Sequence, residues 1–233
     1  MIGSLYSSDD LVALWISLRL ATLTVLLLLL LCTPLAWWLA TTRSRLRVIG
    51  EATAALPLVL PPTVLGFYLL LFLGPNGWGG ALMHALGLRP LSFSFGGLLF
   101  GSVLYSMPFM MQPLQNSFQS VGVRMLEIAA TLRATPLDRF FSVAVPLARR
   151  GFITGAALTF AHTLGEFGVV LMLGGNIPGR TQTASIAIFN HVETFDYAGA
   201  QRLSLTLLLT CFALLLLVYA TNRRTPDPTA AQV

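Results

Sequence analysis

The chain has 233 residues, of which 55% are hydrophobic and only 10% are charged, and its mean hydropathy is +0.77. Soluble domains carry about a quarter charged residues, so this composition predicts an integral membrane protein. The net charge of +5 comes from arginine without any lysine. This excludes a phosphate-binding loop of the GxxxxGK(S/T) type and Schiff-base chemistry on lysine. Cys32 and Cys211 lie in apolar runs without a partner at metal-ligand spacing.

Five apolar stretches are long enough to cross a bilayer as helices, which takes about 20 residues. They are residues 20–40, 52–73, 93–111, 152–173 and 203–221. Prolines interrupt the second at Pro57, Pro61 and Pro62 and the third at Pro108, which membrane helices tolerate. The stretch 182–192 is too short to span and is a candidate re-entrant or interfacial element. We therefore expect a single all-α transmembrane domain over residues 1–233, with about five spans and six possible.

The arginines predict the orientation of the chain in the membrane. Ten of the 14 follow the first, third and fifth stretches, including a group within the loop 124–150. Cytoplasmic connections are enriched in arginine and lysine, so we expect the N-terminus outside and the C-terminus inside. The loop 124–150 is then cytoplasmic.

This loop has the pattern of two short helices joined by a corner. Residues 124–133 form the first, and Thr135 is a candidate N-cap of the second, with Pro136 at its first position and an acid at its third. We expect the second helix to run to about Val145 and to end at Pro146. A linker lying on the lipid headgroups is the simpler interpretation, which the two acids in the loop disfavour.

The same loop resembles the EAA loop of ABC importer permeases. Glu127, Ile128 and Ala129 fall on its E-A-A, and the segment ending at Pro146 falls on its closing I-x-L-P. The resemblance implies a coupling helix that docks on a separate ATPase subunit, where ATP and magnesium would bind. Arg133 stands where the family has glycine and disfavours a left-handed corner by about 1 kcal/mol. We expect either a looser corner or a direct contact of this arginine with the ATPase.

Two other segments resemble the molybdate and sulfate branch of these permeases. They are LPLVLPPTVLGFYLL (residues 56–70) and HTLGEFGVVLMLGGNIPGRTQTASIAIFNHVE (residues 162–193), and the second is more similar to molybdate permeases. The likeness covers about residues 11–221. It implies a homodimeric, non-catalytic permease subunit of a bacterial inner membrane, with ATPase subunits and an external molybdate-binding protein as partners. Tungstate, sulfate and thiosulfate remain alternative substrates.

Several residues are candidates for the transport path. Pro61 and Pro62 would kink the second span and shape a gate. Glu166 is an intramembrane carboxylate, for which we expect either a structural role at a helix break or a role in gating. His162 lies four residues earlier and is a candidate core histidine. A proton-coupled carrier that uses Glu166 is the less favoured alternative. His162 and Glu166 together supply too few ligands for a metal site.

Polar residues near the end of the fourth stretch are candidates for an outer mouth. They could donate hydrogen bonds to an arriving anion or to the binding protein, although a solvated loop is an equal alternative. These residues are Asn176, Arg180, Thr181 and Thr183. Phe140 and Phe141 are the candidate anchors on the ATPase, and Pro136 belongs to the same coupling segment. Glu127 is suited to pairing with a basic residue of the ATPase or to holding the corner closed. Besides the protein partners we expect contact with membrane lipid, and no cofactor or nucleic acid on this chain.

Overall fold

The structure is a computed structural model that describes residues 7–42 and 44–222. Every regular element in this part of the chain is helical. The main helices are α1 (Ser8–Thr41), α2 (Leu46–Val59), α3 (Pro62–Leu73), α4 (Trp78–Ala85), α5 (Phe95–Thr131), α8 (Arg149–Gly165), α9 (Gly168–Gly174), α10 (Ala184–Glu193) and α11 (Tyr197–Asn222). Three short pieces make up the loop between α5 and α8: α6 (Pro136–Asp138), the π-helical turn η2 (Arg139–Ala144) and α7 (Val145–Leu147).

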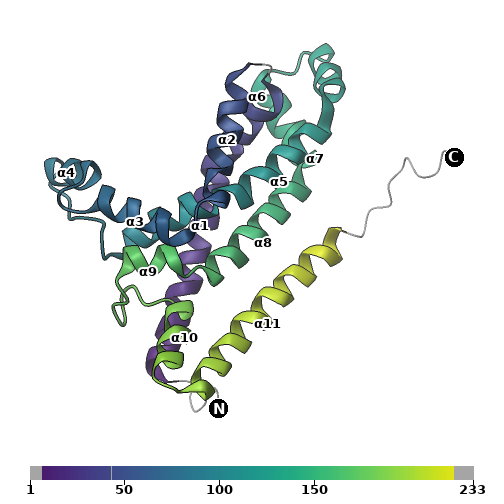
Figure 1. Cartoon of the computed structure of the whole chain (residues 1–233). Coiled ribbons are helices and arrows are strands. Elements are labelled where there is room, and N and C mark those ends of the chain that lie inside the picture. Colours follow the sequence, from purple (N-terminus) through teal and green to yellow (C-terminus); the bar gives the residue numbers. More distant parts are fainter. Residues whose placement is uncertain (1–6, 43, 223–233) are drawn as a thin grey trace.

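Helix α1 is the central support of the fold and packs against both α5 and α8 (Figure 1). It begins twelve residues before the predicted stretch because Ser7 and Asp10 form a capping box. The Ser7 hydroxyl accepts a hydrogen bond from the Asp10 N–H at 3.1 Å. Small and apolar side chains, among them Leu28, Cys32 and Ala36, are fully buried along its inner face.

The second predicted span is bent by 109° between α2 and the segment Pro62–Ala85. Pro61 has an extended ψ of 135° and precedes Pro62, the first residue of α3. A residue before proline is pushed out of the helical region, so consecutive prolines end α2 and start α3 in a new direction. The predicted break at these prolines is confirmed. Pro57, in contrast, lies inside α2.

Helix α5 corrects the expectation for the third stretch. Pro108 and Pro113 both lie within it without ending it, and the kink comes instead at Gly122, with φ 73° and ψ 152°. Each proline removes one backbone hydrogen bond, and the hydrogen bonds on both sides keep the helix continuous. Gly122 adopts a backbone conformation with positive φ, which residues that carry a side chain rarely adopt.

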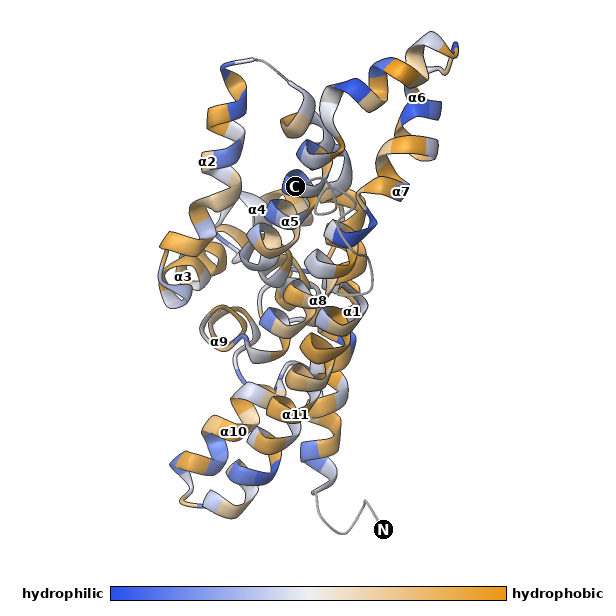
Figure 2. Cartoon of the chain, turned by 90° about the vertical axis from the view of Figure 1, so that its right-hand side faces the viewer, coloured by the Kyte–Doolittle hydropathy of each residue, from blue (hydrophilic) through white to orange (hydrophobic). Residues whose placement is uncertain are grey.

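The fourth stretch is bent by 60° between α8 and α9. Among the described residues, α1 and α11 are long and apolar enough to cross a membrane, and four spans result if each bent pair counts as one. The third predicted stretch lies in α5, which is not among them. Figure 2 shows hydrophilic residues on α2 and α6 towards one end and on α10 at the other, with mostly apolar residues on the helices between them. The arrangement is that of an all-helical membrane protein.

Candidate functional site

The loop between α5 and α8 begins with a left-handed corner at Arg133, whose φ is 61°. The Arg133 N–H donates to the carbonyl of Ala130 at 3.0 Å, and the Ala134 N–H donates to that of Ala129 at 3.1 Å. These two hydrogen bonds are the Schellman pattern that commonly ends a helix before a glycine. Arginine therefore does not loosen the corner, because the hydrogen bonds offset its conformational cost of about 1 kcal/mol.

The second half of the loop starts as the sequence predicts and ends differently. Thr135 is the N-cap, its hydroxyl accepts from the Asp138 N–H at 3.2 Å, and Pro136 takes the first helical position. Pro146 does not stop the helix, because it lies in α7, directly after η2. The wider π-helical turn relieves the clash between a proline ring and the preceding turn. The helical path ends two residues later, at Ala148.

The two phenylalanines of the loop have different environments. The ring of Phe140 points inward and lies 5.3 Å from that of Trp37 and 6.1 Å from that of Phe118, centre to centre. Phe141 is 64% exposed. Leu132 and Leu137 are also exposed, at 78% and 71%. Phe140 thus attaches the loop to α1 and α5. The other three side chains are apolar and exposed, and we name them together the loop ridge.

The E-A-A residues of the loop also divide by exposure. Ala129 is buried, whereas Ile128 is half exposed and Glu127 is exposed. Glu127 lines a cavity of about 490 Å³ together with Arg47 and Arg139. The Nε of Arg139 is buried and makes no hydrogen bond within the described part of the chain. This cavity places a carboxylate and two guanidinium groups directly beneath the loop.

The candidate gate residues meet where α8 breaks into α9. A cavity of about 470 Å³ is lined by Pro62, Glu166, His162 and Tyr105. Glu166 is only 4% exposed and has an extended ψ of 130° at the end of α8. Its Oε2 accepts from the Ser102 hydroxyl at 2.7 Å, while its Oε1 is buried and makes no hydrogen bond to any described residue. Pro61 caps α3 one residue away but does not line this cavity.

His162 is held by neighbours on α5. Its Nδ1 lies 2.9 Å from the Ser106 hydroxyl, and its ring stacks on Phe109 with 4.0 Å between the centres. The Ser106 hydroxyl also lies 3.0 Å from that of Thr163. This is the environment of a hydrogen-bonded core histidine.

The outer-mouth prediction needs correction for two of its four residues. Thr181 is fully buried, and its hydroxyl donates to the Gly174 carbonyl at 2.7 Å. Thr183 is also buried, with its hydroxyl 2.9 Å from that of Ser185. Asn176 forms a reciprocal pair of hydrogen bonds with Asn190. These groups stabilise the loop between α9 and α10. Of the four predicted residues, Arg180 is the one that is both charged and exposed.

Comparison with known proteins decides the class. The family described as "Binding-protein-dependent transport system inner membrane component" matches residues 32–226 of the chain. The chain belongs to this family. The permease is 57% identical to the "Molybdenum transport system permease protein ModB" of Azotobacter vinelandii, over 93% of its own length and 96% of that protein's. It is 33% identical to the "Probable sulfate transport system permease protein cysT" of Zygnema circumcarinatum, over 79% of its own length and 64% of that protein's.

A solved structure shares the fold of the permease. It is described as the crystal structure of a bacterial ABC transporter involved in the import of the acidic polysaccharide alginate, and the TM-score is 0.77 at 16% identity. The match covers 95% of the permease and 81% of that chain. The predicted family and the all-helical permease fold are confirmed. The chain is a multi-pass inner-membrane transport subunit rather than an enzyme, and membership implies a separate binding protein and an ATPase as partners.

Sequence reasoning missed the serines that hold the candidate gate residue Glu166 and its neighbour His162. Ser102 and Ser106 lie four residues apart on α5, and the residues they bond, Glu166 and His162, lie four residues apart on α8. Equal spacing on two packed helices is the signal that could have paired them. Ser185 was also missed, and its hydroxyl donates to the backbone carbonyl of Glu166. The break between α8 and α9 is thus bonded to both α5 and α10.

A second missed group lies at the opposite end of the permease from the loop (Figure 1). The two ring nitrogens of His191 lie 2.8 Å from Asp10 and 2.9 Å from Asp196. The Gly199 N–H donates to Asp196 and lowers the pKa of that carboxyl, with His191 adding to the effect. The group ties α10 to the start of α1 and to the corner before α11. It is a structural contact.

Proposed function

We propose that the permease translocates molybdate across the bacterial inner membrane, as a homodimer that works with two ATPase subunits and an external molybdate-binding protein. The observation that supports molybdate as the substrate is the 57% identity to a molybdenum transport permease over nearly the whole of both chains. Sulfate is the second candidate, supported by the 33% identity to a sulfate transport permease. Tungstate and thiosulfate belong to the same chemical class of tetrahedral oxyanions.

In this proposal the loop ridge is the contact with the ATPase, on which ATP and magnesium bind. Leu132, Leu137 and Phe141 are apolar side chains that water would otherwise surround. Burying such a group against a partner is favourable, and exposed aromatic residues often dominate protein interfaces. Phe140 makes the loop rigid by packing against Trp37 and Phe118. Movement of the ATPase would therefore be transmitted to α1 and α5 through a rigid contact.

The gate in this proposal is the cavity where Pro62 and Glu166 meet. Gly168 lies so close to α3 that an added Cβ would stand 3.0 Å from the Cβ of Pro62. The breaks of both bent pairs therefore lie against each other, and a displacement of one changes the other. A carboxylate repels an oxyanion, so Glu166 serves to hold the break through Ser102 and Ser185 rather than to bind substrate.

The orientation we propose has the N-terminus outside and the C-terminus inside. The start of α1 and the corner between α10 and α11 lie at one end of the molecule, and the α6–α7 loop lies at the other (Figure 1). Because the loop docks on a cytoplasmic ATPase, the first end faces outward. Arg180 lies in the loop before α10 and is proposed to meet the binding protein or the anion.

A second copy of the chain would cover the side arm formed by α3 and α4. This arm projects from the rest of the molecule in Figure 1. It exposes large apolar side chains, including Tyr68 at 64%, Leu71 at 55% and Trp78 at 89%. Lipid can solvate such groups as well, so the test is the number of permease chains in the purified complex, measured by mass spectrometry.

The experiment that tests the transport function uses the permease and its ATPase in liposomes together with the binding protein. ATP-dependent uptake of labelled molybdate, tungstate and sulfate is measured in the same preparation. We expect uptake of molybdate that requires both ATP and the binding protein. Uptake of sulfate alone would show that sulfate, the second candidate, is the substrate. Uptake driven by a proton gradient without ATP would refute the proposal.

A further inference from the structure

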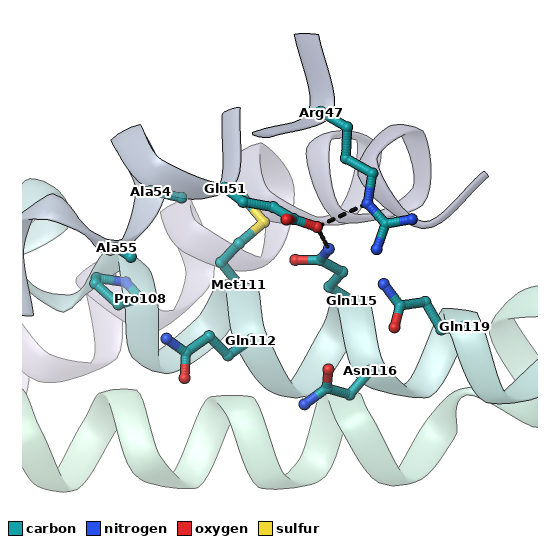
Figure 3. A pocket seen from close by; sticks show the side chains of 10 residues that line it. All are labelled: Arg47, Glu51, Ala54, Ala55, Pro108, Met111, Gln112, Gln115, Asn116 and Gln119. Carbon is teal, nitrogen blue, oxygen red and sulfur yellow. Dashed lines mark hydrogen bonds and ion pairs between the residues drawn. The ribbon is translucent and has the colours of Figure 1, made fainter. Parts of the chain in front are cut away.

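A polar cavity of about 360 Å³ lies between α2 and α5, separate from the gate (Figure 3). Four amide side chains of α5 line it, at spacings of three and four residues that place them on one face of the helix. They are Gln112, Gln115, Asn116 and Gln119. The opposite wall comes from α2, with Arg47 and Glu51.

The charges in this cavity are arranged so that donors remain available. The Nε of Arg47 donates to Glu51 Oε1 at 2.8 Å, and the Gln115 amide donates to the same oxygen at 2.5 Å. This pairing offsets the negative charge of Glu51. In Figure 3 the rest of the Arg47 guanidinium lies on the side of Gln119. The side chains of Gln112, Asn116 and Gln119 are exposed and make no hydrogen bond to any residue that the structure describes, so their amide N–H groups are free to bind a ligand.

The amide cavity lies between two other cavities along the same face of α5. Tyr105 lines the gate cavity, and Pro108, three residues later, lines the amide cavity. At its other end the amide cavity shares Arg47 and Gln119 with the cavity that Glu127 lines under the loop. The three cavities thus follow one another from the gate to the loop that faces the ATPase in the proposed function.

We propose that the amide cavity is a transient binding site for a tetrahedral oxyanion on the cytoplasmic half of the transport path. The proposal rests on the proposed function, since it takes the permease to carry an oxyanion. The N–H groups of Gln112, Asn116 and Gln119 donate to the anion's oxygens, and Arg47 offsets the charge of Glu51, which would otherwise repel the anion. Hydrogen bonds to a charged acceptor are stronger than those between neutral groups, so three amides suffice to hold a dianion briefly.

The chemistry of the site suits passage rather than storage. A site on a transport path must bind strongly enough to admit the ion and weakly enough to release it. Neutral amides carry no full charge, and Glu51 compensates that of Arg47. A cluster of uncompensated arginines would retain the anion. The amide row therefore fits an ion that is passing to the cytoplasm.

The test replaces donors by carboxylates of the same shape. Gln112→Glu and Asn116→Asp each remove an N–H donor and add a negative charge, with little change in volume. Molybdate, and in a second series sulfate, is titrated calorimetrically into the purified permease–ATPase complex without ATP or binding protein. We expect each variant to weaken oxyanion binding about tenfold or more, the scale of one lost hydrogen bond to a charged group. Uptake should fall with it, while the loaded binding protein still stimulates ATP hydrolysis.

Gln201→Glu is the matched control, because Gln201 is an exposed amide on α11, away from the cavity. It should bind and transport like the wild type. Gln112→Met removes the donor without adding charge and serves if the carboxylate variants fail to assemble. Unchanged binding and uptake in the cavity variants, beside active wild type, would overturn this site alone. Uptake of neither oxyanion by the wild type would overturn the proposed function and the site with it.

Discussion

The two adjacent phenylalanines of the loop should respond to the same substitution in opposite ways. Phe140→Ala removes a ring that packs against Trp37, Phe118 and Phe141 at 5.3, 6.1 and 4.9 Å. Truncating a phenylalanine in a core costs about 3–5 kcal/mol. Phe140 is only partly buried, so we expect about 2–3 kcal/mol, consistent with aromatic pairs that each contribute about 0.5–1.5 kcal/mol.

Phe141→Ala should leave the fold intact and weaken the contact with the ATPase. Its side chain is 64% exposed and loses only the ring contact with Phe140, so we expect a smaller loss of stability than for Phe140→Ala, about 1 kcal/mol. An aromatic anchor at the centre of an interface is worth about 2–4 kcal/mol, which corresponds to a loss of affinity of roughly 30-fold to 1,000-fold. The expected result is a small loss of stability with poor co-purification of the ATPase and little uptake.

Stability can be followed through the thiol of Cys32, which is fully buried in the apolar cluster that Phe140 packs against. Cys211→Ser removes the other cysteine, and a thiol-reactive dye then reports unfolding of the permease during heating. Co-purification and stimulated ATP hydrolysis are measured on the same samples. Equal stability of the two alanine variants would refute the inward role of Phe140. Full coupling in Phe141→Ala would refute the loop ridge as the contact.

Three further predictions follow from single residues. Arg133→Gly should raise the free energy of unfolding by up to about 1 kcal/mol, because glycine accepts φ 61° without strain; a loss of stimulated ATP hydrolysis would show instead that the arginine contacts the ATPase. Arg180→Ala should lower uptake and leave assembly and basal ATP hydrolysis intact, and unchanged uptake would return it to a solvated loop. A cysteine at Thr135 should resist an impermeant reagent added to intact cells, and labelling from outside would reverse the proposed orientation.

The pattern of residues was sufficient to predict where the second helix of the loop starts, although not where it ends. Thr135, Pro136 and an acid at the third position specify a helix start whichever way the surrounding protein folds, because the cap bonds only neighbouring residues. Consecutive prolines at Pro61 and Pro62 likewise break a helix by their own geometry. Apolar composition predicted the membrane class for the same reason: the cost of charged groups in lipid does not depend on the fold.

Only the tertiary structure decided which side chains face one another. Phe140 and Phe141 are equivalent in the sequence, and the packing of the loop on α1 and α5 turns one inward and leaves the other exposed. Thr181 looks like a surface donor until its hydroxyl is seen to bond inside the loop. Burial and hydrogen bonding between distant segments depend on how helices cross, and a periodic pattern along one helix does not contain that information. The sequence determined the membrane class, the helix start at Thr135 and the break at Pro61 and Pro62, while packing decided where other helices end or bend and which residues face one another.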